Sequence, residues 1–246
     1  MAIKTIGVVG AGQMGNGIAH VCALAGYDVV LHDISEEQIS RALETIDYNM
    51  ERQVSREKIT AEDKQAALER IRTTTDINDL KDVDLAIEAA TENEDIKREI
   101  FKQLCPILKP EALLATNTSS ISITRLAAGT DRPERFVGLH FMNPVPVMKL
   151  VEIIRGIATD EETFNEGMEI VRRIGKQPAV AEDFPAFIVN RVLLPMINEA
   201  VYTLYEGVGN VEAIDLIGRV SGRDRVWLLV VAESLGNDAR LCEMKV

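Results

Sequence analysis

A glycine-rich turn between an apolar run and a helical pattern limits what this chain can fold into more than any other feature. The turn reads Gly10-Ala11-Gly12-Gln13-Met14-Gly15 and directly follows the apolar run 3–9. Its first glycine permits a tight strand-to-helix turn, Gly12 lets the backbone approach a pyrophosphate, and Gly15 lets the helix pack closely on the strand. Free N–H groups at the start of such a helix favour an anion. The pattern predicts a dinucleotide site; the alternative is a glycine-rich turn with no ligand.

An acidic residue closes the second apolar run, as a dinucleotide site requires. Asp33 comes directly after the run 29–32, at the expected end of the second strand. Its carboxylate would accept hydrogen bonds from a ribose with two free hydroxyls and would repel a 2′-phosphate. NAD is therefore favoured over NADP as the cofactor.

Composition limits the compartment and the partners. The 246 residues carry a formal net charge of −12, whereas a nucleic-acid surface needs a basic excess, so no nucleic acid is expected as a partner. The chain lacks a long apolar run for a membrane span and has no room for a signal peptide before Ile3. Cys22, Cys105 and Cys242 lack metal-ligand spacing, which predicts reduced thiols and no metal site in a cytoplasmic protein.

Strand and helix signals alternate through most of the chain. Apolar segments at 85–90 and 113–116 alternate with helical patterns at 35–50, 61–71 and 95–104. Such alternation is typical of an α/β fold, here a Rossmann-type, doubly wound and mainly parallel sheet with helices on both faces. A continuous helical period follows from Phe187. We therefore expect an NAD-binding domain over 1–184 and a smaller all-helical domain over 185–246.

Only one of the three histidines lies where a general base is expected. His140 lies on an apolar strand, and Glu152 lies on the next one. If the two strands fold back about Pro146, the two side chains face each other. A carboxylate on the second imidazole nitrogen fixes the tautomer and raises basicity, as in a general acid/base. The alternative is a structural ion pair, and His20 and His32 are interpreted as packing or surface residues.

Two polar features stay open on spacing alone. Asn117-Thr118-Ser119-Ser120 follows a predicted strand at its carboxyl end, where open α/β sheets bind ligands. Its hydroxyls suit a substrate oxygen or the nicotinamide carboxamide, but they equally suit the cap of a helix near Ile121. Asn190 is a polar residue on the apolar helical stretch, and its spacing alone does not decide its role.

Together these segments resemble the L-3-hydroxyacyl-CoA dehydrogenase family, most closely its short bacterial 3-hydroxybutyryl-CoA dehydrogenase branch. The resemblance covers about residues 1–215. The matching segments are the glycine motif 10–15, Asn117-Thr118-Ser119-Ser120, Gly138-Leu139-His140-Phe141-Met142-Asn143-Pro144-Val145-Pro146, Lys149-Leu150-Val151-Glu152 and Phe187-Ile188-Val189-Asn190-Arg191. Five motifs in the family order and at the family spacing make the resemblance specific.

The resemblance implies the roles of the catalytic residues. His140 is implied as the general base that takes the proton of the 3-hydroxyl while hydride leaves C3 for the nicotinamide, and Glu152 as the residue that orients and polarises it. Ser119 and Asn190 are implied to hold the reacting oxygen, as preorganised donors around developing charge.

The resemblance also implies ligand contacts and an assembly. The implied NAD contacts are the segment from Gly10 to Gly15, Asp33, Glu92, Lys97, Ser119 and Asn143. The implied coenzyme A contacts are Asn49, Arg52 and Arg56, for which a solvated helix face is the alternative. Cations there would give an acidic protein the local basic patch that an anionic substrate needs. A homodimer is the assembly expected from the family.

The chain departs from the family pattern in two places. Ala186 follows Pro185 where the family usually has glycine, a change that stiffens or shifts the entry to the second domain. From Leu216 the chain leaves the family pattern, with charged residues around Trp227 and an apolar run at 226–232. Our hypothesis is a frameshift or an alternative gene end that removes part of the dimer interface and one wall of the acyl pocket. It predicts low solubility and a mixed oligomeric state.

The sequence therefore predicts an NAD-dependent oxidoreductase that interconverts (S)-3-hydroxyacyl-CoA, above all 3-hydroxybutyryl-CoA, and 3-oxoacyl-CoA. Two alternatives remain. One is an enzyme of the same fold for another acyl chain, such as 3-hydroxyadipyl-CoA. The other is an NAD-binding protein with little turnover, because its C-terminal domain is incomplete.

Overall fold

The computed structural model describes residues 3–220, which fall into two compact units that meet between Phe187 and Ile188. The first unit holds the sheet and the helices packed on it. The described part of the second unit consists of α7 (Val189–Tyr205), which contains Pro195, and α8 (Val211–Val220). The charged cluster at Trp227 and the apolar run 226–232 lie outside the described residues.

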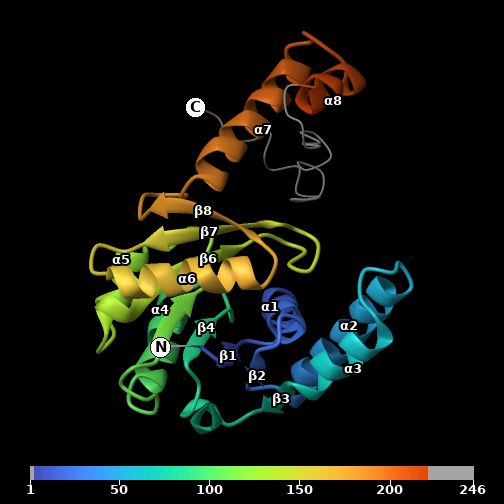
Figure 1. Ribbon diagram of the computed structural model, residues 1–246. Helices are drawn as coiled ribbons and strands as arrows, with labels where there is room; N and C mark the ends of the chain where they lie inside the picture. The colour runs from blue at the N-terminus through green and yellow to red at the C-terminus, as the bar shows by residue number, and fades with distance from the viewer. Residues whose placement is uncertain (1–2, 221–246) are drawn as a thin grey trace. The chain divides into compact units, whose positions relative to one another are not determined.

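The first unit is built on an eight-stranded sheet with the order β3-β2-β1-β4-β5-β6-β7-β8 (Figure 1). All neighbouring strands are parallel except β6 and β7, which are antiparallel. The doubly wound, mainly parallel sheet expected from the sequence is confirmed. The strands are β1 (Thr5–Val9), β2 (Asp28–His32), β3 (Ile71–Thr74), β4 (Leu85–Glu88), β5 (Leu113–Thr116), β6 (Phe136–Phe141), β7 (Leu150–Arg155) and β8 (Gln177–Glu182).

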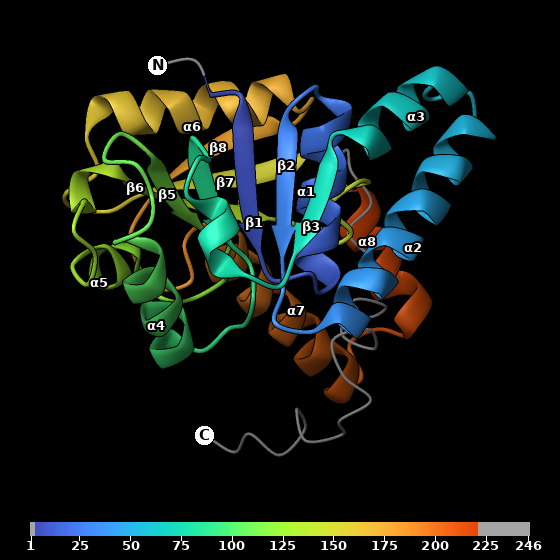
Figure 2. The same ribbon diagram turned by 90° about the horizontal axis from the view of Figure 1, so that it is seen from below.

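Helices cover both faces of this sheet and bury two apolar clusters against it. One cluster includes Ile18 of α1 and Ile170 of α6, and the other includes Phe101 of α4 and Leu126 of α5 (Figure 2). The helices of the unit are α1 (Gln13–Leu24), α2 (Glu36–Val54), α3 (Ala61–Glu69), α4 (Glu94–Leu104), α5 (Ile123–Ala127) and α6 (Glu161–Arg173), with short 3-10 turns at Ile77–Leu80 and Pro133–Arg135.

Local sequence signals explain where these helices begin. The Ser35 hydroxyl accepts the Gln38 N–H at the start of α2, and Thr60 with Asp63 forms a reciprocal capping box at the start of α3. Helix α3 ends at Glu69, two residues earlier than expected, because Ile71 pairs with Val29 as the first residue of the edge strand β3. None of the described helices is long and apolar enough to cross a membrane.

The order of the strands places a ligand-binding edge at the centre of the sheet. Strands β2 and β4 lie on opposite sides of β1, so the connections after β1 and β4 pass to opposite faces. Open α/β sheets bind ligands in the crevice that opens at the carboxyl ends of the strands at such a switch point. The glycine motif follows β1 at this edge, and the segment 117–120 follows β5 there.

Candidate active site

The three motif glycines differ in what a side chain at each position would meet. Gly10 has φ +100°, and a Cβ on it would lie 2.6 Å from the Cα of Ala90. A Cβ on Gly15 would lie 1.7 Å from the Gly10 carbonyl oxygen, whereas a Cβ on Gly12 would meet nothing within 4 Å. The first two glycines are thus required by the turn and by helix packing. Gly12 leaves open the space into which a pyrophosphate would approach.

The start of α1 presents its N–H groups without a side-chain cap, since Gly12 occupies the N-cap position. The Asp33 Oδ2 accepts the Ala11 N–H at 2.8 Å and its Oδ1 accepts the Ser35 N–H at 3.0 Å. Each carboxylate oxygen can accept more than one hydrogen bond, so ribose hydroxyls can still bind. The loop and the carboxylate therefore fit the adenosine ribose and diphosphate of NAD.

An apolar pocket of about 290 Å³ lies beside Asp33. Its walls include Ile34 from the link after β2, Ile77 from the turn after β3, and Ile96 and Ile100 from α4. Ile34 is 90% exposed, which is unusual for a large aliphatic side chain unless a ligand covers it. The flat, apolar face of an adenine ring matches such a pocket. The sequence does not predict this pocket, because its residues come from separate segments whose spacing has no common signal.

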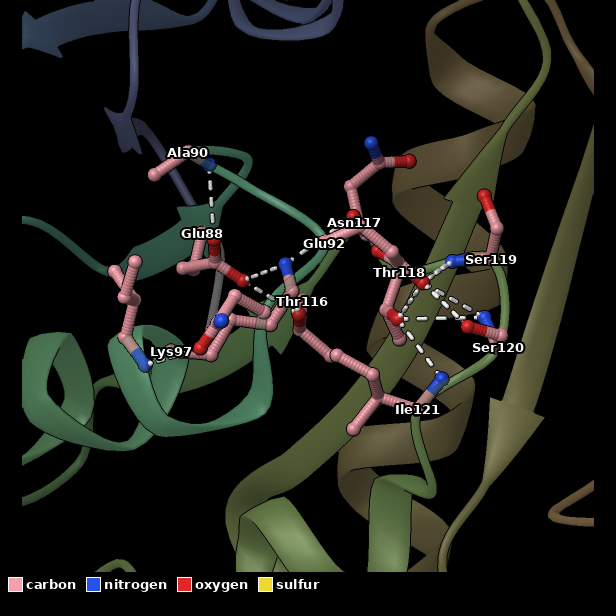
Figure 3. A network of polar contacts seen from close by, with 12 residues as sticks. Glu88, Ala90, Glu92, Lys97, Thr116, Asn117, Thr118, Ser119, Ser120 and Ile121 are labelled. Carbon is pink, nitrogen blue, oxygen red and sulfur yellow. Dashed lines mark hydrogen bonds and ion pairs between the residues drawn. The ribbon is translucent and has the colours of Figure 1, made fainter.

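A buried ion pair supports the edge between β4 and β5 (Figure 3). Lys97 and Glu88 are both fully buried, and the Lys97 ammonium contacts a Glu88 carboxylate oxygen that also accepts the Thr116 hydroxyl at 2.7 Å. The other Glu88 oxygen accepts the Ala90 N–H at 2.8 Å. The pair thus ties α4 to the ends of both strands. Direct contact of Lys97 with the cofactor stays a prediction, because the Lys97 ammonium is in contact with Glu88.

Glu92 organises the segment that follows β5. Its Oε1 accepts the Thr118 hydroxyl at 2.7 Å and the N–H groups of Ser119 and Ser120 at 2.8 and 2.9 Å. In Figure 3 the Ser119 hydroxyl points away from this carboxylate. Among the hydroxyls of the segment, Thr118 accepts the Ile121 N–H at 3.1 Å, as the capping alternative predicts, and the cap of the following helix is Ser122, whose side chain accepts the Arg125 N–H. Ser119 is held by its backbone and exposed at the ligand edge.

His140 and Glu152 face each other across the antiparallel pair of β6 and β7, as the fold-back about Pro146 predicts. The His140 Nδ1 lies 2.7 Å from the Glu152 Oε2, and both side chains are buried. The Nε2 is then the ring nitrogen available to a ligand, because Nδ1 is in contact with Glu152. The neighbouring Asn117 accepts the Phe141 N–H at 2.9 Å, which fixes β6 to the end of β5.

Phe187 covers this pair on one side. Its ring centroid lies 6.0 Å from that of His140 at a tilt of 58°, and its side chain is 3% exposed. Ala186 and Phe187 both have positive φ, of 67° and 50°. A non-glycine residue is strained in this region, so alanine in place of the usual glycine stores strain at the entry to α7. The contact with His140 was missed because it joins residues far apart in the sequence.

The remaining histidines are buried packing residues. His20 is 1% exposed and its Nε2 lies 3.2 Å from the Gln53 side-chain oxygen. Burial is the largest cause that lowers the pKa of His20 to about 4; the Gln53 hydrogen bond opposes it and the Lys176 charge adds to it. Burial also lowers the pKa of His32. Neither lies in the His140 pair.

The candidate coenzyme A residues line one small pocket. Asn49, Arg52 and Arg56 surround it together with Pro144 and Pro146 from the link that follows β6. Their spacing of three and four residues puts them on one side of the chain under the helical-face alternative too, so the coenzyme A contacts stay a prediction. Asn143 is exposed on the same link, and Asn190 lies on α7 in the second unit. The described residues include no cluster of His, Cys, Asp or Glu that could hold a metal ion.

Two family models match the chain over most of its length. Residues 5–184 match the NAD-binding domain of 3-hydroxyacyl-CoA dehydrogenase, and residues 187–239 match its C-terminal domain. The second match extends beyond Leu216, where the sequence pattern was expected to depart; the frameshift hypothesis stays a prediction.

Two relatives and one solved structure are similar over nearly the whole chain. A 3-hydroxybutyryl-CoA dehydrogenase of Bradyrhizobium diazoefficiens is 60% identical over 99% of this chain and 83% of that protein. The 3-hydroxyadipyl-CoA dehydrogenase of Escherichia coli is 44% identical over 96% of this chain and 50% of that protein. The crystal structure of (S)-3-hydroxybutyryl-CoA dehydrogenase from Ralstonia eutropha superposes with a TM-score of 0.91 at 45% identity, covering 98% of this chain and 85% of that one.

Proposed function

This chain belongs to the 3-hydroxyacyl-CoA dehydrogenase family, whose members are NAD-dependent oxidoreductases, and we propose that it interconverts (S)-3-hydroxybutyryl-CoA and acetoacetyl-CoA with His140 as general base. The observation that carries the proposal is the buried His140–Glu152 pair across β6 and β7, with His140 toward the carboxyl end of β6, the edge of the sheet at which the glycine loop follows β1. A structural ion pair alone gives no reason for the exposed Ser119 and the open Gly12 at the same edge of the sheet.

The chemistry divides between the cofactor and the side chains. NAD, when bound, accepts the hydride from C3 of the hydroxyacyl group. In the same step the O–H proton passes to the neutral His140 Nε2, and the C3–O bond becomes a carbonyl. The products are NADH, the 3-oxoacyl thioester and a protonated imidazole. Glu152 stabilises that charge through its contact of 2.7 Å with Nδ1.

Ser119 and Asn190 are proposed to hold the substrate oxygen. The fixed backbone of Ser119, bonded to Glu92, supports this role because a preorganised hydroxyl needs no reorganisation as charge develops. Asn190 lies in the first turn of α7, in the second unit, and its proposed role rests on the family resemblance. Glu92, Lys97 and Asn143 are proposed to contact or support the cofactor.

The coenzyme A part of the substrate is proposed to bind at the pocket of Arg52, Arg56 and Asn49. Two guanidinium groups at one pocket suit a diphosphate, because the planar fork of arginine matches phosphate oxygens. The chain as a whole has a net charge of −12 and repels anionic ligands. Local positive charge at this pocket offsets that repulsion.

Two acyl chains are in question. The relative from Escherichia coli named for 3-hydroxyadipyl-CoA favours a second candidate substrate. Steady-state NADH oxidation with acetoacetyl-CoA and with 3-oxoadipyl-CoA separates them. A higher kcat/KM for acetoacetyl-CoA supports the short chain. A higher value for the adipyl thioester contradicts it. If the chain turns over neither thioester, the proposed substrate class is wrong.

We propose that the chain forms a homodimer in the cytoplasm. Exposed apolar side chains on α7 support self-association, among them Val192 at 61% and Tyr205 at 86% exposure. Light scattering on the purified chain tests the assembly: a monodisperse dimer supports it. A monomer, or the mixed state expected from the tail hypothesis, contradicts it.

A further inference from the structure

Strand β6 extends beyond one of the two strands beside it, and His140 lies in the part that extends. The pairing of β5 with β6 ends where Thr116 is paired with Gly138. On the other side, β7 stays paired with β6 as far as Phe141. Within the described sheet, residues 139–141 are therefore held by strand pairing on one side only. A general base on such a segment needs a further contact, because the rate depends on its exact position.

The side chain of Asn117 makes such a contact. Asn117 is the first residue after β5, and its Oδ1 accepts the Phe141 N–H at 2.9 Å. A backbone N–H can only donate, so the amide oxygen must face Phe141 and the amide nitrogen must face away from it. Phe141 is 2% exposed, and a buried N–H without an acceptor is unfavourable. The amide thus takes the place of the strand partner that β5 does not provide at this point.

The backbone of Asn117 is itself held on both sides. Its N–H donates to the Glu88 carbonyl oxygen at 2.7 Å, which continues the pairing of β5 with β4. Its own carbonyl oxygen lies 3.5 Å from the Nζ of Lys97, the buried partner of the Glu88 carboxylate. A side chain on a backbone held in this way loses little conformational freedom when it forms its hydrogen bond. The buried ion pair, Asn117 and the end of β6 therefore form one connected set of polar contacts.

The direction of the Asn117 side chain suits a role at the ligand edge. In Figure 3 the Asn117 amide and the Ser119 hydroxyl project to the same side of their segment, away from the Glu92 carboxylate. Glu92 holds the backbone of this segment through the Ser119 N–H. The carboxyl ends of the strands, where open α/β sheets bind ligands, lie at this edge. One short segment thus carries Ser119 and also holds the strand of His140.

We propose that Asn117 is a positioning residue for the general base, which holds the end of β6 so that the His140 Nε2 meets the 3-hydroxyl of the substrate. The inference rests on the proposed function and adds to it a residue that acts through His140. Glu152 fixes the imidazole ring by its contact with Nδ1, whereas Asn117 fixes the backbone that carries the ring. A displacement of about 1 Å at a reacting group lowers the rate by about 100-fold.

The test compares two substitutions of Asn117 in the full chain by NADH oxidation with acetoacetyl-CoA. Asn117→Leu keeps the branched shape but has no acceptor, whereas Asn117→Asp keeps an oxygen that can accept the Phe141 N–H. We expect kcat to fall by about 10- to 100-fold in Asn117→Leu, with KM for acetoacetyl-CoA within about twofold of the wild type. Asn117→Asp should keep kcat within about fivefold. Asn210→Leu is the matched control and should keep the wild-type kcat, because the Asn210 Oδ1 accepts the Ala213 N–H at the same 2.9 Å in the second unit.

A double-mutant cycle separates this role from a general loss of structure. If Asn117 acts through His140, Asn117→Leu should not lower the residual kcat of His140→Ala any further. General damage to the site would lower kcat by the same factor in both backgrounds. Urea unfolding shows whether each variant is folded, and Asn117→Ala replaces Asn117→Leu if the larger side chain prevents folding.

Several results would overturn the inference. They are a kcat of Asn117→Leu within about threefold of the wild type, an equal loss of kcat in Asn117→Asp or in Asn210→Leu, or the same further loss in the His140→Ala background. If the wild type does not turn over acetoacetyl-CoA, the proposed function is wrong. Hydrogen exchange at the Phe141 amide then tests the contact by itself. The exchange rate should rise at least about 10-fold in Asn117→Leu but not in Asn117→Asp, and an unchanged rate in Asn117→Leu would show that Asn117 does not hold β6.

Discussion

Replacement of Glu152 by glutamine tests whether the His140 pair is catalytic. The change keeps the size of the side chain and removes its negative charge 2.7 Å from the His140 Nδ1. Glu152 is fully buried, and solvent therefore screens its interaction with His140 weakly. A hydrogen bond to a charged group contributes about 1.5–3 kcal/mol. Loss of the carboxylate therefore destabilises the protonated imidazole by an amount of this order.

That loss falls on the transition state, where the imidazole gains its proton. We therefore expect kcat for oxidation of 3-hydroxybutyryl-CoA to fall by about 10- to 150-fold in Glu152→Gln. NADH affinity, measured by fluorescence titration, should not change. Glu161→Gln is the matched control, because Glu161 also contacts a cation at 2.7 Å, Arg155, but is 72% exposed. Exposed pairs contribute little.

The reasoning is refuted if Glu152→Gln keeps kcat within about threefold of the wild type while it folds normally. It is equally refuted if Glu161→Gln loses as much activity. Chemical unfolding of both variants separates a catalytic loss from a loss of structure. A fold that is weakened without an effect on kcat would mean that the pair is a structural ion pair.

Three further predictions concern cofactor choice and stability. NADH should bind about 5- to 150-fold more tightly than NADPH, because Asp33 repels the 2′-phosphate, and equal affinities by titration would contradict this. His20 has a pKa lowered by burial to about 4 in the folded state, against 6.5 unfolded, so the stability it contributes is full above pH 6.5 and is lost as pH falls toward 4. In the wild type, the free energy of unfolding measured in urea should fall by ~2 kcal/mol between pH 7.5 and pH 5. His20→Gln should not show this fall. Ala186→Gly should raise the free energy of unfolding by ~0.5–1 kcal/mol, because glycine adopts a φ of +67° without strain. A lower urea midpoint in this variant would show that no strain is present.

The parts of the site that the sequence predicts are those with short-range signals. The glycine turn, the acid at Asp33 and the alternation of strands and helices depend on neighbouring residues, and each is present in the fold. The facing of His140 and Glu152 was also predictable, because the two residues lie at equal distances from the turn at Pro146.

Other features depend on contacts between distant segments, which spacing does not reveal. Strand β3 lies at the edge of the sheet and none of its four residues is buried, so it lacks the buried apolar run that marks β4 and β5. Glu88 ends an apolar strand, and the buried partner that neutralises it, Lys97, comes from the next helix. The contact between the rings of Phe187 and His140 is of the same kind, because only the fold brings these two side chains together.

The most direct test of the account is NADH consumption by the purified chain with acetoacetyl-CoA, in the wild type and in His140→Ala. We expect the wild type to oxidise one NADH for each 3-hydroxybutyryl-CoA formed. His140→Ala should lose about 10²- to 10⁴-fold in kcat with unchanged NADH binding, because a general base contributes about that much. A wild type that binds NADH without acetoacetyl-CoA-dependent turnover would contradict the proposed function, and near-normal kcat in His140→Ala would contradict the role given to the histidine.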